Sequence, residues 1–431
     1  MYNSPIKINI SGSKSITNRI LILCALSNQK TLIKNIGICE DVICMIDSLK
    51  KLGIKISKKG NDLEIIGNNG NFLKQNKELI KLNTKNAGTT TRFLTALCVF
   101  CKNNILIDGD RRIKERPIKE LTDALKNLGS NIKTANGYLP LAISPSLKTG
   151  GSIKIKGNIS SQFISALLLT QFLSKQNTTI NIEQNIYSKP YIEMTIKLLN
   201  QFRIKVLNKN FKQLVIKGDQ VPKSQKIIKI EPDASSASYI GEFCAINKKS
   251  VIIENLNRNS IQGDIKFLNY LKKMGCKISN EKDGTKITGP KLLKPLGKID
   301  FNETPDLVMT FAVLAMFAKG KTKICNIENL RIKESDRISA LKNEIKKFGI
   351  KVNTGKDFIE IQGSREILEK NRLLKFTINT YNDHRIAMCF GVLKNLFPNI
   401  KIKNPSCVKK SYVNFWKNLV RLYSIGGKIP F

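Results

Sequence analysis

The chain of 431 residues carries 73 lysine and arginine side chains against 33 aspartate and glutamate side chains, which gives a formal net charge of +40. Its hydrophobic content of 41% allows a sizeable core, and its length predicts about two domains. No apolar run reaches the roughly 18 residues that a membrane-spanning helix needs, so we expect no membrane partner.

The high net charge admits a nucleic-acid-binding protein as one interpretation. The basic residues, however, are spread along the whole chain and do not gather in an arm, a tail or one helix. Basic and aromatic residues do not alternate as they do in stripes that stack on single strands. We therefore favour a general drift of composition towards Lys, Asn and Ile, and we expect no nucleic-acid partner. A positive field would still attract small anionic substrates.

Ten cysteines occur at irregular spacings, and the N-terminus has no charged-then-apolar leader. This usage favours a reduced, cytoplasmic setting over a disulfide framework. Cys98 and Cys101 form a CxxC pair inside an apolar run, but a second pair at zinc-ribbon spacing is missing. We interpret the pair as core packing and predict no metal site there.

The first chemically distinctive stretch is Ser11–Arg19, which follows a short strand-like run at residues 6–10 and precedes an apolar helical pattern. Small residues at a strand-to-helix junction let backbone N–H groups face an anion, and the helix dipole adds to this attraction. Lys14 and Arg19 add full positive charges. The stretch predicts a phosphate or carboxylate seat, with an ordinary helix cap as the alternative; its spacing matches no nucleotide-binding loop.

A repeating unit of about 74 residues then runs through the chain: an amphipathic helix, a glycine stop, and two short alternating strands. The stops are at Gly53, Gly129, Gly275 and Gly349, with a degenerate copy at residues 196–218. Each unit carries a second, strongly apolar helix upstream, which predicts a buried helix. We therefore expect an α/β (α+β) fold of six βαβαββ units in two domains, divided near residues 231–236, with a site assembled from both halves.

Several stretches in these units combine small or polar residues with cations at expected helix starts. They are 86–92, 110–117, 160–163 and 188–191. The densest is Asn329–Arg337, and if it enters a helix, Lys333 and Arg337 share a face at i,i+4. Residues 381–385 include His384, the only histidine of the chain, which excludes multi-histidine zinc sites. Each run by itself also fits a helix cap or a solvated charge cluster.

Taken together, these stretches predict a strongly cationic site that holds a few carboxylates, Asp306, Glu334 and Asp383. Such a site suits small, multiply charged anions such as phosphates and carboxylates. It also suits chemistry in which a carboxyl group moves a proton while cations hold charge in place.

The ordered motifs resemble those of the 5-enolpyruvylshikimate-3-phosphate synthase family from residue 11 to about 412. They are Ser-Gly-Ser-Lys-Ser-x-x-Asn-Arg, Asn-Ala-Gly-Thr, Arg-x-Lys-Glu-Arg-Pro, Ser-Ser-Gln-Phe, Ser-Lys-Pro-Tyr, Asp-Ala-Ser-Ser-Ala, Pro-Asp, Asn-x-Arg-x-Lys-Glu-x-Asp-Arg, Asn-Asp-His-Arg and a lysine near Cys407. The resemblance implies the enolpyruvyl transferase fold, also described as an inside-out α/β barrel. It also implies an N-terminal domain at 11–231, a C-terminal domain at 1–10 plus 232–431, and crossovers near 10–14 and 231–235.

The implied reaction transfers the enolpyruvyl group of phosphoenolpyruvate to the 5-hydroxyl of shikimate 3-phosphate and releases phosphate, with no cofactor or metal, in a chain expected to be monomeric. The implied catalytic residues are Asp306, which takes the hydroxyl proton, Glu334, which protonates the methylene carbon, Lys14 and His384. The implied shikimate 3-phosphate contacts are Lys14, Ser15, Arg19, Ser160, Ser161, Gln162, Ser188, Tyr191, Asp306, Asn329 and Lys333. The implied phosphoenolpyruvate contacts are Lys14, Asn86, Gly88, Arg116, Gln162, Arg337, Arg385 and Lys410.

Two alternatives remain open at this point. The sister enzyme that transfers enolpyruvyl to UDP-N-acetylglucosamine shares the fold, but it usually has Lys-Asn after the first glycine and a reactive cysteine in a loop. Here Lys14 is followed by Ser15, and the 112–117 loop contains no cysteine. A basic nucleic-acid-binding protein would account for the charge but not for the ordered motifs.

Overall fold

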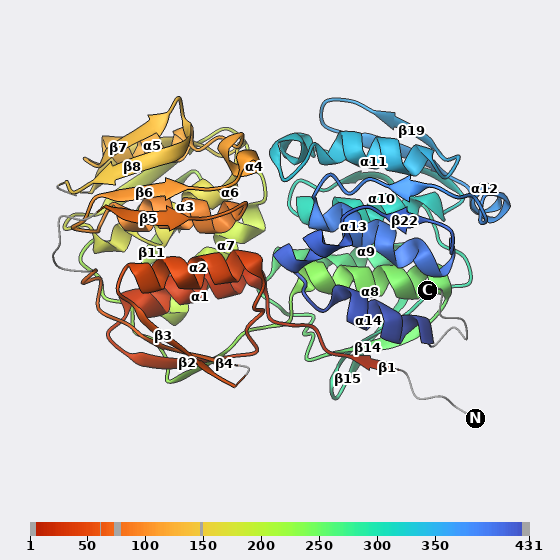
Figure 1. The fold of residues 1–431 in the computed structure, drawn as a ribbon, viewed down its shortest axis with the longest axis horizontal. Helices are drawn as coiled ribbons and strands as arrows, with labels where there is room; N and C mark the ends of the chain where they lie inside the picture. The colour runs from red at the N-terminus through yellow and green to blue at the C-terminus, as the bar shows by residue number, and fades with distance from the viewer. Residues whose placement is uncertain (1–5, 61, 73–78, 147–149, 425–431) are drawn as a thin grey trace. The chain divides into compact units, whose positions relative to one another are not determined.

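The computed structural model describes residues 6–60, 62–72, 79–146 and 150–424 (Figure 1). The chain divides into two compact units. We call Gly12–Ile230 the N-terminal unit, and Met1–Ser11 together with Glu231–Phe431 the C-terminal unit. β1 (Ile6–Ile8) pairs in parallel with β14 (Ser250–Glu254), so the first strand of the chain belongs to the C-terminal unit.

The N-terminal unit repeats one four-stranded sheet three times, each with two principal helices. The first sheet has the order β13 (Ile227–Lys229), β2 (Lys30–Lys34), β4 (Asp62–Ile66), β3 (Lys55–Lys59), with α1 (Lys14–Leu26) and α2 (Glu40–Lys51). The second has the order β5 (Ile80–Asn83), β6 (Ile105–Asp108), β8 (Tyr138–Ser144), β7 (Asn131–Ala135), with α3 (Gly88–Cys98), α4 (Arg111–Lys114) and α5 (Lys119–Asn127). The third has the order β9 (Gly151–Lys156), β10 (Thr178–Glu183), β12 (Gln213–Ile216), β11 (Val206–Lys209), with α6 (Ser161–Leu168) and α7 (Lys189–Gln201).

The C-terminal unit repeats the same sheet twice and ends in a shorter version. Its first sheet has the order β1, β14, β16 (Gly284–Thr288), β15 (Lys277–Glu281), with α8 (Ala234–Asn247) and α9 (Phe267–Lys273). Its second has the order β17 (Gly297–Asp300), β18 (Gly320–Cys325), β20 (Ile359–Gly363), β19 (Lys351–Thr354), with α10 (Val308–Met316) and α11 (Arg337–Lys346). In the described residues the third has two strands, β21 (Thr377–Ile378) and β22 (Lys401–Ile402), with α12 (Arg365–Lys370), α13 (His384–Gly391) and α14 (Phe415–Tyr423).

The expected α/β fold of two domains built from repeated small sheets is therefore confirmed. In each of the five four-stranded sheets the first two strands in the order given are parallel, and the last two form an antiparallel hairpin at the other edge. The two strands of the sixth unit are parallel, as are the first two strands of the other units.

The glycine stops are also confirmed, because each adopts the positive φ that glycine reaches without strain: 89° at Gly53, 85° at Gly129, 102° at Gly275 and 80° at Gly349. In the degenerate third copy Arg203 takes this place with φ of 62°. The degenerate sequence thus keeps the same chain reversal, although a side chain makes that conformation less favourable.

The predicted division between buried and solvated helices is confirmed as well. Every residue of α3 and of α10 is buried, while α5, α9 and α11 bury one face. Cys98 and Cys101 lie in the core at the end of α3, which bears out core packing; burial, followed by the neighbouring Cys101, raises the pKa of the Cys98 thiol. No helix among the described residues is long and apolar enough to cross a bilayer.

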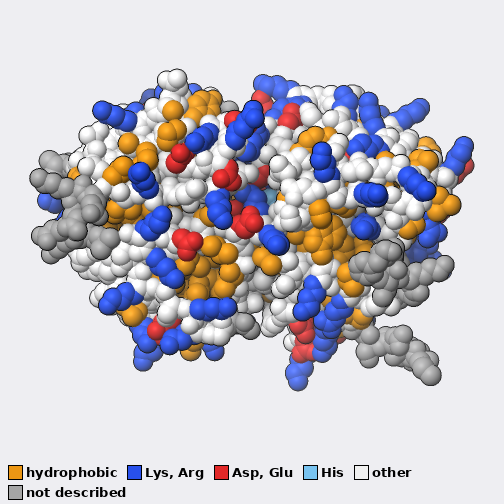
Figure 2. All heavy atoms as spheres, viewed as in Figure 1, with side chains coloured by type: hydrophobic (Ala, Val, Ile, Leu, Met, Phe, Trp, Pro, Cys, Tyr) orange, Lys and Arg blue, Asp and Glu red, His pale blue; other side chains and the backbone are white. Residues whose placement is uncertain are grey.

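Figure 2 shows lysine and arginine side chains scattered across the visible face of each unit. They do not merge there into one continuous basic patch, which fits the expectation of a charge drift spread over the whole sequence.

Candidate functional site

The predicted site residues of the N-terminal unit lie at or beside the N-termini of its buried helices. We call this set the N-terminal group: Lys14, Ser15, Arg19, Asn86, Gly88, Arg116, Ser160, Ser161, Gln162, Ser188 and Tyr191. The first turn of a helix leaves backbone N–H groups without intrahelical partners, and the helix dipole makes this end positive. Gathering several such ends favours an anion.

A chain of side-chain contacts joins four of these helix starts. The Lys14 ammonium donates to the Asp41 carboxylate at 3.0 Å, which links α1 to α2. The Thr90 hydroxyl donates to the Asp41 carbonyl at 2.8 Å and brings in α3, and the Gln162 amide donates to the Thr89 hydroxyl at 3.2 Å and brings in α6. The structure therefore brings Lys14, the start of α3 and Gln162 together.

Gly88 and Arg116 lie against each other at the start of α3. A Cβ atom placed on Gly88 would lie 2.7 Å from Arg116 Nη1 and 2.9 Å from Nη2, closer than atoms approach. Arg92 holds the same corner, because its guanidinium donates to the carbonyls of Gly88 at 3.3 Å and Pro117 at 3.0 Å. Arg116 is itself buried. The absence of a side chain at Gly88 is what allows a guanidinium to occupy this helix start.

Arg19 is enclosed by protein. Its guanidinium donates to Thr195 Oγ1 at 2.7 Å, Ser165 Oγ at 3.2 Å and the Ser15 carbonyl at 2.8 Å, and it lies 5.0 Å from the centre of the Phe93 ring. Burial lowers its pKa to about 9, so it stays protonated at neutral pH. Arg19 thus ties the first turn of α1 to α6 and α7.

The serines Ser160, Ser161 and Ser188 of the N-terminal group lie at helix starts. The Ser160 hydroxyl accepts from the Gln162 N–H at 3.3 Å and caps α6, with Ser161 buried next to it. Ser188 precedes α7 in a left-handed conformation with φ of 58°, and its carbonyl accepts from the Tyr191 N–H at 3.0 Å.

The predicted site residues of the C-terminal unit form a second cluster, which we call the C-terminal group: Asp306, Asn329, Lys333, Glu334, Arg337, His384, Arg385 and Lys410. Asp306 lies in the short helix η3 (Pro305–Leu307) before α10, Arg337 opens α11, and His384 opens α13. Asn329 and Lys410 come from η4 (Glu328–Ile332) and η6 (Pro405–Lys410). Helix starts again lie together, but here, unlike in the N-terminal unit, most of the side chains at them are charged.

Arg337 is the centre of this cluster. Its side chain is 1% exposed and contacts three carboxylates: Asp383 at 2.8 Å, Glu334 at 2.9 Å and Asp306 at 3.1 Å. Because the three carboxylates outnumber the single guanidinium, further cations are needed nearby to balance the charge.

Arg385 and Lys410 supply those cations. Arg385 donates to the Asp306 carboxylate at 2.6 Å, and Lys410 Nζ lies 3.8 Å from Glu334 Oε1. Burial would favour the neutral form of Asp306, but Arg385, Arg337 and Lys333 together hold its pKa well below the usual value. Asp306 is therefore ionised, and two arginines stabilise its negative charge.

Asp383 is a fully buried carboxylate that holds several groups of the cluster in place. It caps α13 by accepting from the Arg385 N–H at 2.9 Å, and accepts from the Ser335 hydroxyl at 3.0 Å. His384 is 1% exposed, and its Nδ1 lies 3.7 Å from Asp383 Oδ1. His384 is therefore a buried neighbour of Asp383.

The condition under which Lys333 and Arg337 would share a helical face is not met. Asp336 caps α11 by accepting from the Ser339 N–H at 3.1 Å, so this helix begins only at Arg337. Lys333 lies in an extended linker between η4 and α11. Asn329 is 4% exposed, and its Oδ1 has no hydrogen-bond partner among the described residues, so it is available to a ligand.

Sequence reasoning missed several residues that hold these clusters, namely Asp41, Thr90, Ser165, Thr195, Ser235 and Asp264. Asp264 is buried and accepts from the Ser235 hydroxyl; burial, followed by the negative charge of Asp306, raises its pKa to about 7. Acidic residues are scarce in this chain. An Asp that precedes a small-residue or apolar helical run could therefore have been identified from the sequence as a candidate partner of the cations.

Comparison with known proteins places the chain in one class. Residues 5–419 match the family described as EPSP synthase (3-phosphoshikimate 1-carboxyvinyltransferase). A protein of that name from Buchnera aphidicola subsp. Cinara cedri is 43% identical over 97% of this chain and 94% of its own length. One from Escherichia coli SMS-3-5 is 39% identical over 96% of each. The structure of EPSP synthase from Acinetobacter baumannii has a TM-score of 0.77 at 22% identity, covering 98% of this chain and 96% of that one, and shows the same fold.

The family match and the named relatives define a transferase of enolpyruvyl groups. The chain belongs to the EPSP synthase family, as the motifs indicated. Its activity is the transfer of the enolpyruvyl group of phosphoenolpyruvate to shikimate 3-phosphate, in the synthesis of aromatic amino acids. The UDP-N-acetylglucosamine and nucleic-acid alternatives are not favoured.

Proposed function

We propose that the N-terminal and C-terminal groups act as the binding and catalytic residues of this transfer, with the roles that the motifs imply. The observation that carries the proposal is the shared use of Arg337 and Arg385: the two guanidiniums are paired with the two carboxylates, Asp306 and Glu334, that the reaction needs as base and acid. Asp306 lies in the short helix before α10, and Asn329 Oδ1 is buried without a hydrogen-bond partner among the described residues, which a purely structural ion-pair network does not require.

Shikimate 3-phosphate is held chiefly by neutral donors and helix starts in this proposal. Ser160, Ser161 and Gln162 offer hydroxyl, amide and backbone donors at the start of α6. From α1, Ser15 offers a hydroxyl, and Lys14 and Arg19 offer charged donors. The remaining proposed contacts are Ser188, Tyr191, Asn329, Lys333 and Asp306. The arrangement fits a ligand with one phosphate, one carboxylate and several hydroxyl groups, because serine and amide side chains serve hydroxyls while cations and helix starts serve charges.

Phosphoenolpyruvate is held by cations. In the proposal its phosphate and carboxylate are contacted by Arg116, whose guanidinium lies at the start of α3, and by three cations of the C-terminal group, Arg337, Arg385 and Lys410. The other proposed contacts are Lys14, Asn86, Gly88 and Gln162. A guanidinium pairs with either anion through two parallel hydrogen bonds.

The chemistry then follows from the two carboxylates. Glu334 as a carboxylic acid gives a proton to the methylene carbon of phosphoenolpyruvate, Asp306 takes the proton of the 5-hydroxyl, and the hydroxyl oxygen bonds to the central carbon. Glu334, now a carboxylate, takes a proton back from the new methyl group, and the departing phosphate takes the proton held by Asp306. This restores the double bond, gives the enolpyruvyl ether and returns both side chains to their starting protonation states. Cations that hold phosphate and carboxylate stabilise charge throughout.

Binding of phosphoenolpyruvate also activates the base in this proposal. Without substrate, Arg337 and Arg385 keep Asp306 ionised and only weakly basic. When the anionic groups of phosphoenolpyruvate draw these guanidiniums away, Asp306 loses its stabilising charges and its pKa rises. His384, enclosed behind Asp383, supports the network by position.

A phosphate-release assay with purified protein tests the proposal. We expect turnover that requires both phosphoenolpyruvate and shikimate 3-phosphate and continues in a chelator. Turnover with UDP-N-acetylglucosamine in place of shikimate 3-phosphate, or salt-sensitive DNA binding without turnover, contradicts it. We further propose that the protein is cytoplasmic and monomeric. Light scattering during size-exclusion chromatography tests the monomer through its mass.

A further inference from the structure

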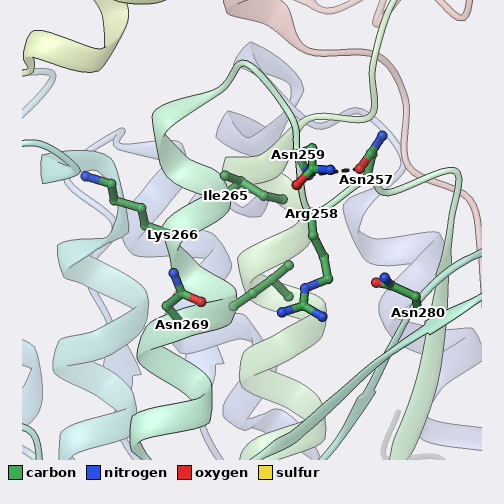
Figure 3. A pocket seen from close by; sticks show the side chains of 8 residues that line it. Asn257, Arg258, Asn259, Ile265, Lys266, Asn269 and Asn280 are labelled. Atoms are coloured by element: carbon green, nitrogen blue, oxygen red, sulfur yellow. Dashed lines mark hydrogen bonds between the residues drawn. The ribbon is translucent and has the colours of Figure 1, made fainter.

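A polar pocket in the C-terminal unit lies among residues that the proposed reaction does not use. It has a volume of about 360 Å³ and lies between the loop after β14, the η2 helix (Gly263–Lys266) with α9, and the edge strand β15 (Figure 3). Its polar lining comes from Asn257, Arg258, Asn259, Lys266, Asn269 and Asn280. The volume falls within the range of small-molecule sites, and no carboxylate belongs to the lining.

The loop that carries Arg258 is held in place. The Thr285 hydroxyl donates to the Leu256 carbonyl at 2.7 Å, and the Asn255 N–H donates to the Asp283 carbonyl at 2.8 Å. The Asn259 N–H donates to Asn257 Oδ1 at 2.8 Å and closes a turn around Arg258. A ligand that binds Arg258 therefore does not have to order this backbone first.

Three polar side chains that line the pocket, Arg258, Asn269 and Asn280, make no hydrogen bond to the described residues. Arg258 makes no hydrogen bond or ion pair with another residue that the structure describes, and its guanidinium points between Asn269 and Asn280 (Figure 3). The side-chain amides of Asn269 and Asn280 likewise have no hydrogen-bond partner in the described part of the chain. Lys266 differs, because its ammonium is paired with Glu303. Arg258 is therefore the one available charge of the lining.

The chemistry of these groups selects a ligand. A guanidinium prefers a phosphate or carboxylate, which it binds through two hydrogen bonds, whereas a side-chain amide both donates to and accepts from hydroxyl groups. Arginine is also scarce, at 13 of the 73 basic residues, so Arg258 is not a simple product of the lysine drift. We propose that this pocket binds a small phosphorylated polyol, with the phosphate on Arg258 and the hydroxyl groups on Asn269 and Asn280.

Nitrogen-15 NMR of the arginine side chains in the full chain tests the proposal at the residue concerned. The Nε–H resonance of Arg258 is identified by its loss in Arg258→Gln, and that of Arg421, an exposed arginine on α14, serves as the control. On titration with ribose 5-phosphate we expect the Arg258 resonance to shift saturably and the Arg421 resonance to stay. No shift of Arg258 up to 10 mM, or equal shifts of both, overturns the proposal.

A second variant separates recognition of hydroxyl groups from simple ion binding. Asn280→Ala is expected to weaken ribose 5-phosphate about fivefold while leaving inorganic phosphate within twofold, because one neutral hydrogen bond is removed. Equal affinity of wild type for ribose 5-phosphate and inorganic phosphate would show an adventitious ion only. Arg258→Gln and Asn280→Ala should keep the wild-type rate of phosphate release, since neither residue belongs to the proposed catalytic groups; loss of that rate would contradict a separate site.

Discussion

The two units use the same repeating sheet but join their helix starts in different ways. In the N-terminal unit the contacts are largely between neutral groups, such as Thr90 with the Asp41 carbonyl and Gln162 with Thr89, and Arg19 is surrounded by hydroxyls and carbonyls. In the C-terminal unit three carboxylates and two guanidiniums share one network around Arg337. One fold therefore carries two different sets of side chains at its helix starts, which the proposed function assigns to holding anions and to exchanging protons.

The largest expected effect breaks the proton chemistry of the C-terminal unit. Glu334→Gln removes the proposed acid while keeping the shape of the side chain, and we expect kcat to fall about 10³-fold, as for loss of a positioned general acid. The measurement is steady-state phosphate release. Glu328→Gln is the matched control, because Glu328 lies on η4, pairs with the exposed Lys356 and does not belong to the C-terminal group. A wild-type kcat in Glu334→Gln would remove its assigned role.

A smaller effect is expected from the anion seat of the N-terminal unit. Gly88→Ala places a methyl group against the Arg116 guanidinium, which is the mobile end of a long side chain and can move. We expect the KM for phosphoenolpyruvate to rise about tenfold with a smaller change in kcat, because one charged contact is misplaced.

The control for this change is Gly60→Ala, where the added methyl group meets no atom within 4 Å, although the positive φ of 61° makes the variant less stable. Its KM should stay at the wild-type value. If Gly88→Ala alters kcat and leaves KM unchanged, the proposed division between a holding unit and a proton-moving unit fails.

A pH-dependent change in stability is expected from a carboxyl group in the core of the C-terminal unit. Glu242 on α8 is fully buried, neither oxygen has a partner in the described residues, and burial raises its pKa well above the usual value. The folded protein therefore binds this proton more tightly than the unfolded chain, so the stability that it contributes is lost as pH rises through the folded pKa.

Glu242→Gln cannot ionise, so its stability in urea unfolding relative to wild type should rise steadily from pH 4.5 to pH 8. The neighbouring groups are Cys389 and Tyr423, whose pKa values are also raised, chiefly by burial. Parallel pH profiles of wild type and Glu242→Gln would contradict a protonated Glu242.

The smallest effect compares the repeats themselves. Arg203 adopts φ of 62° at the place where the other complete units have glycine. We expect Arg203→Gly to stabilise the protein by about 1 kcal/mol in urea unfolding, because glycine reaches this conformation without strain. Gly275→Ala, the reverse change at φ of 102°, should destabilise it. A loss of stability in Arg203→Gly would show that contacts of the arginine side chain outweigh its backbone strain.

The sequence predicted what local patterns control. The glycine stops, the buried helices and the repeat period depend on residues close in the chain, and the structure has them where the pattern indicated. The start of α11 could not be predicted, because the short polar run before it can cap a helix at more than one residue, and Asp336 is the one that does. The short sixth unit was not foreseen from the periodicity.

The partners that fix the site could not be read from the sequence. Asp41 lies 27 residues from Lys14, and Asp383 lies 46 residues from Arg337, so only the folded chain brings each pair together. The motifs identified the charged residues of the site. They did not show which carboxylate pairs with which cation, because several pairings would balance the same charges.

The most direct test of the central claim is to run the reaction in deuterated water and follow the methylene group of the product by proton NMR or mass spectrometry. If Glu334 protonates the methylene carbon and a proton then leaves the transient methyl group, wild-type protein incorporates deuterium into the enolpyruvyl methylene, and Glu334→Gln does so at a rate reduced about 10³-fold. Turnover of wild type without any deuterium in that methylene group would contradict protonation at carbon and the role given to Glu334.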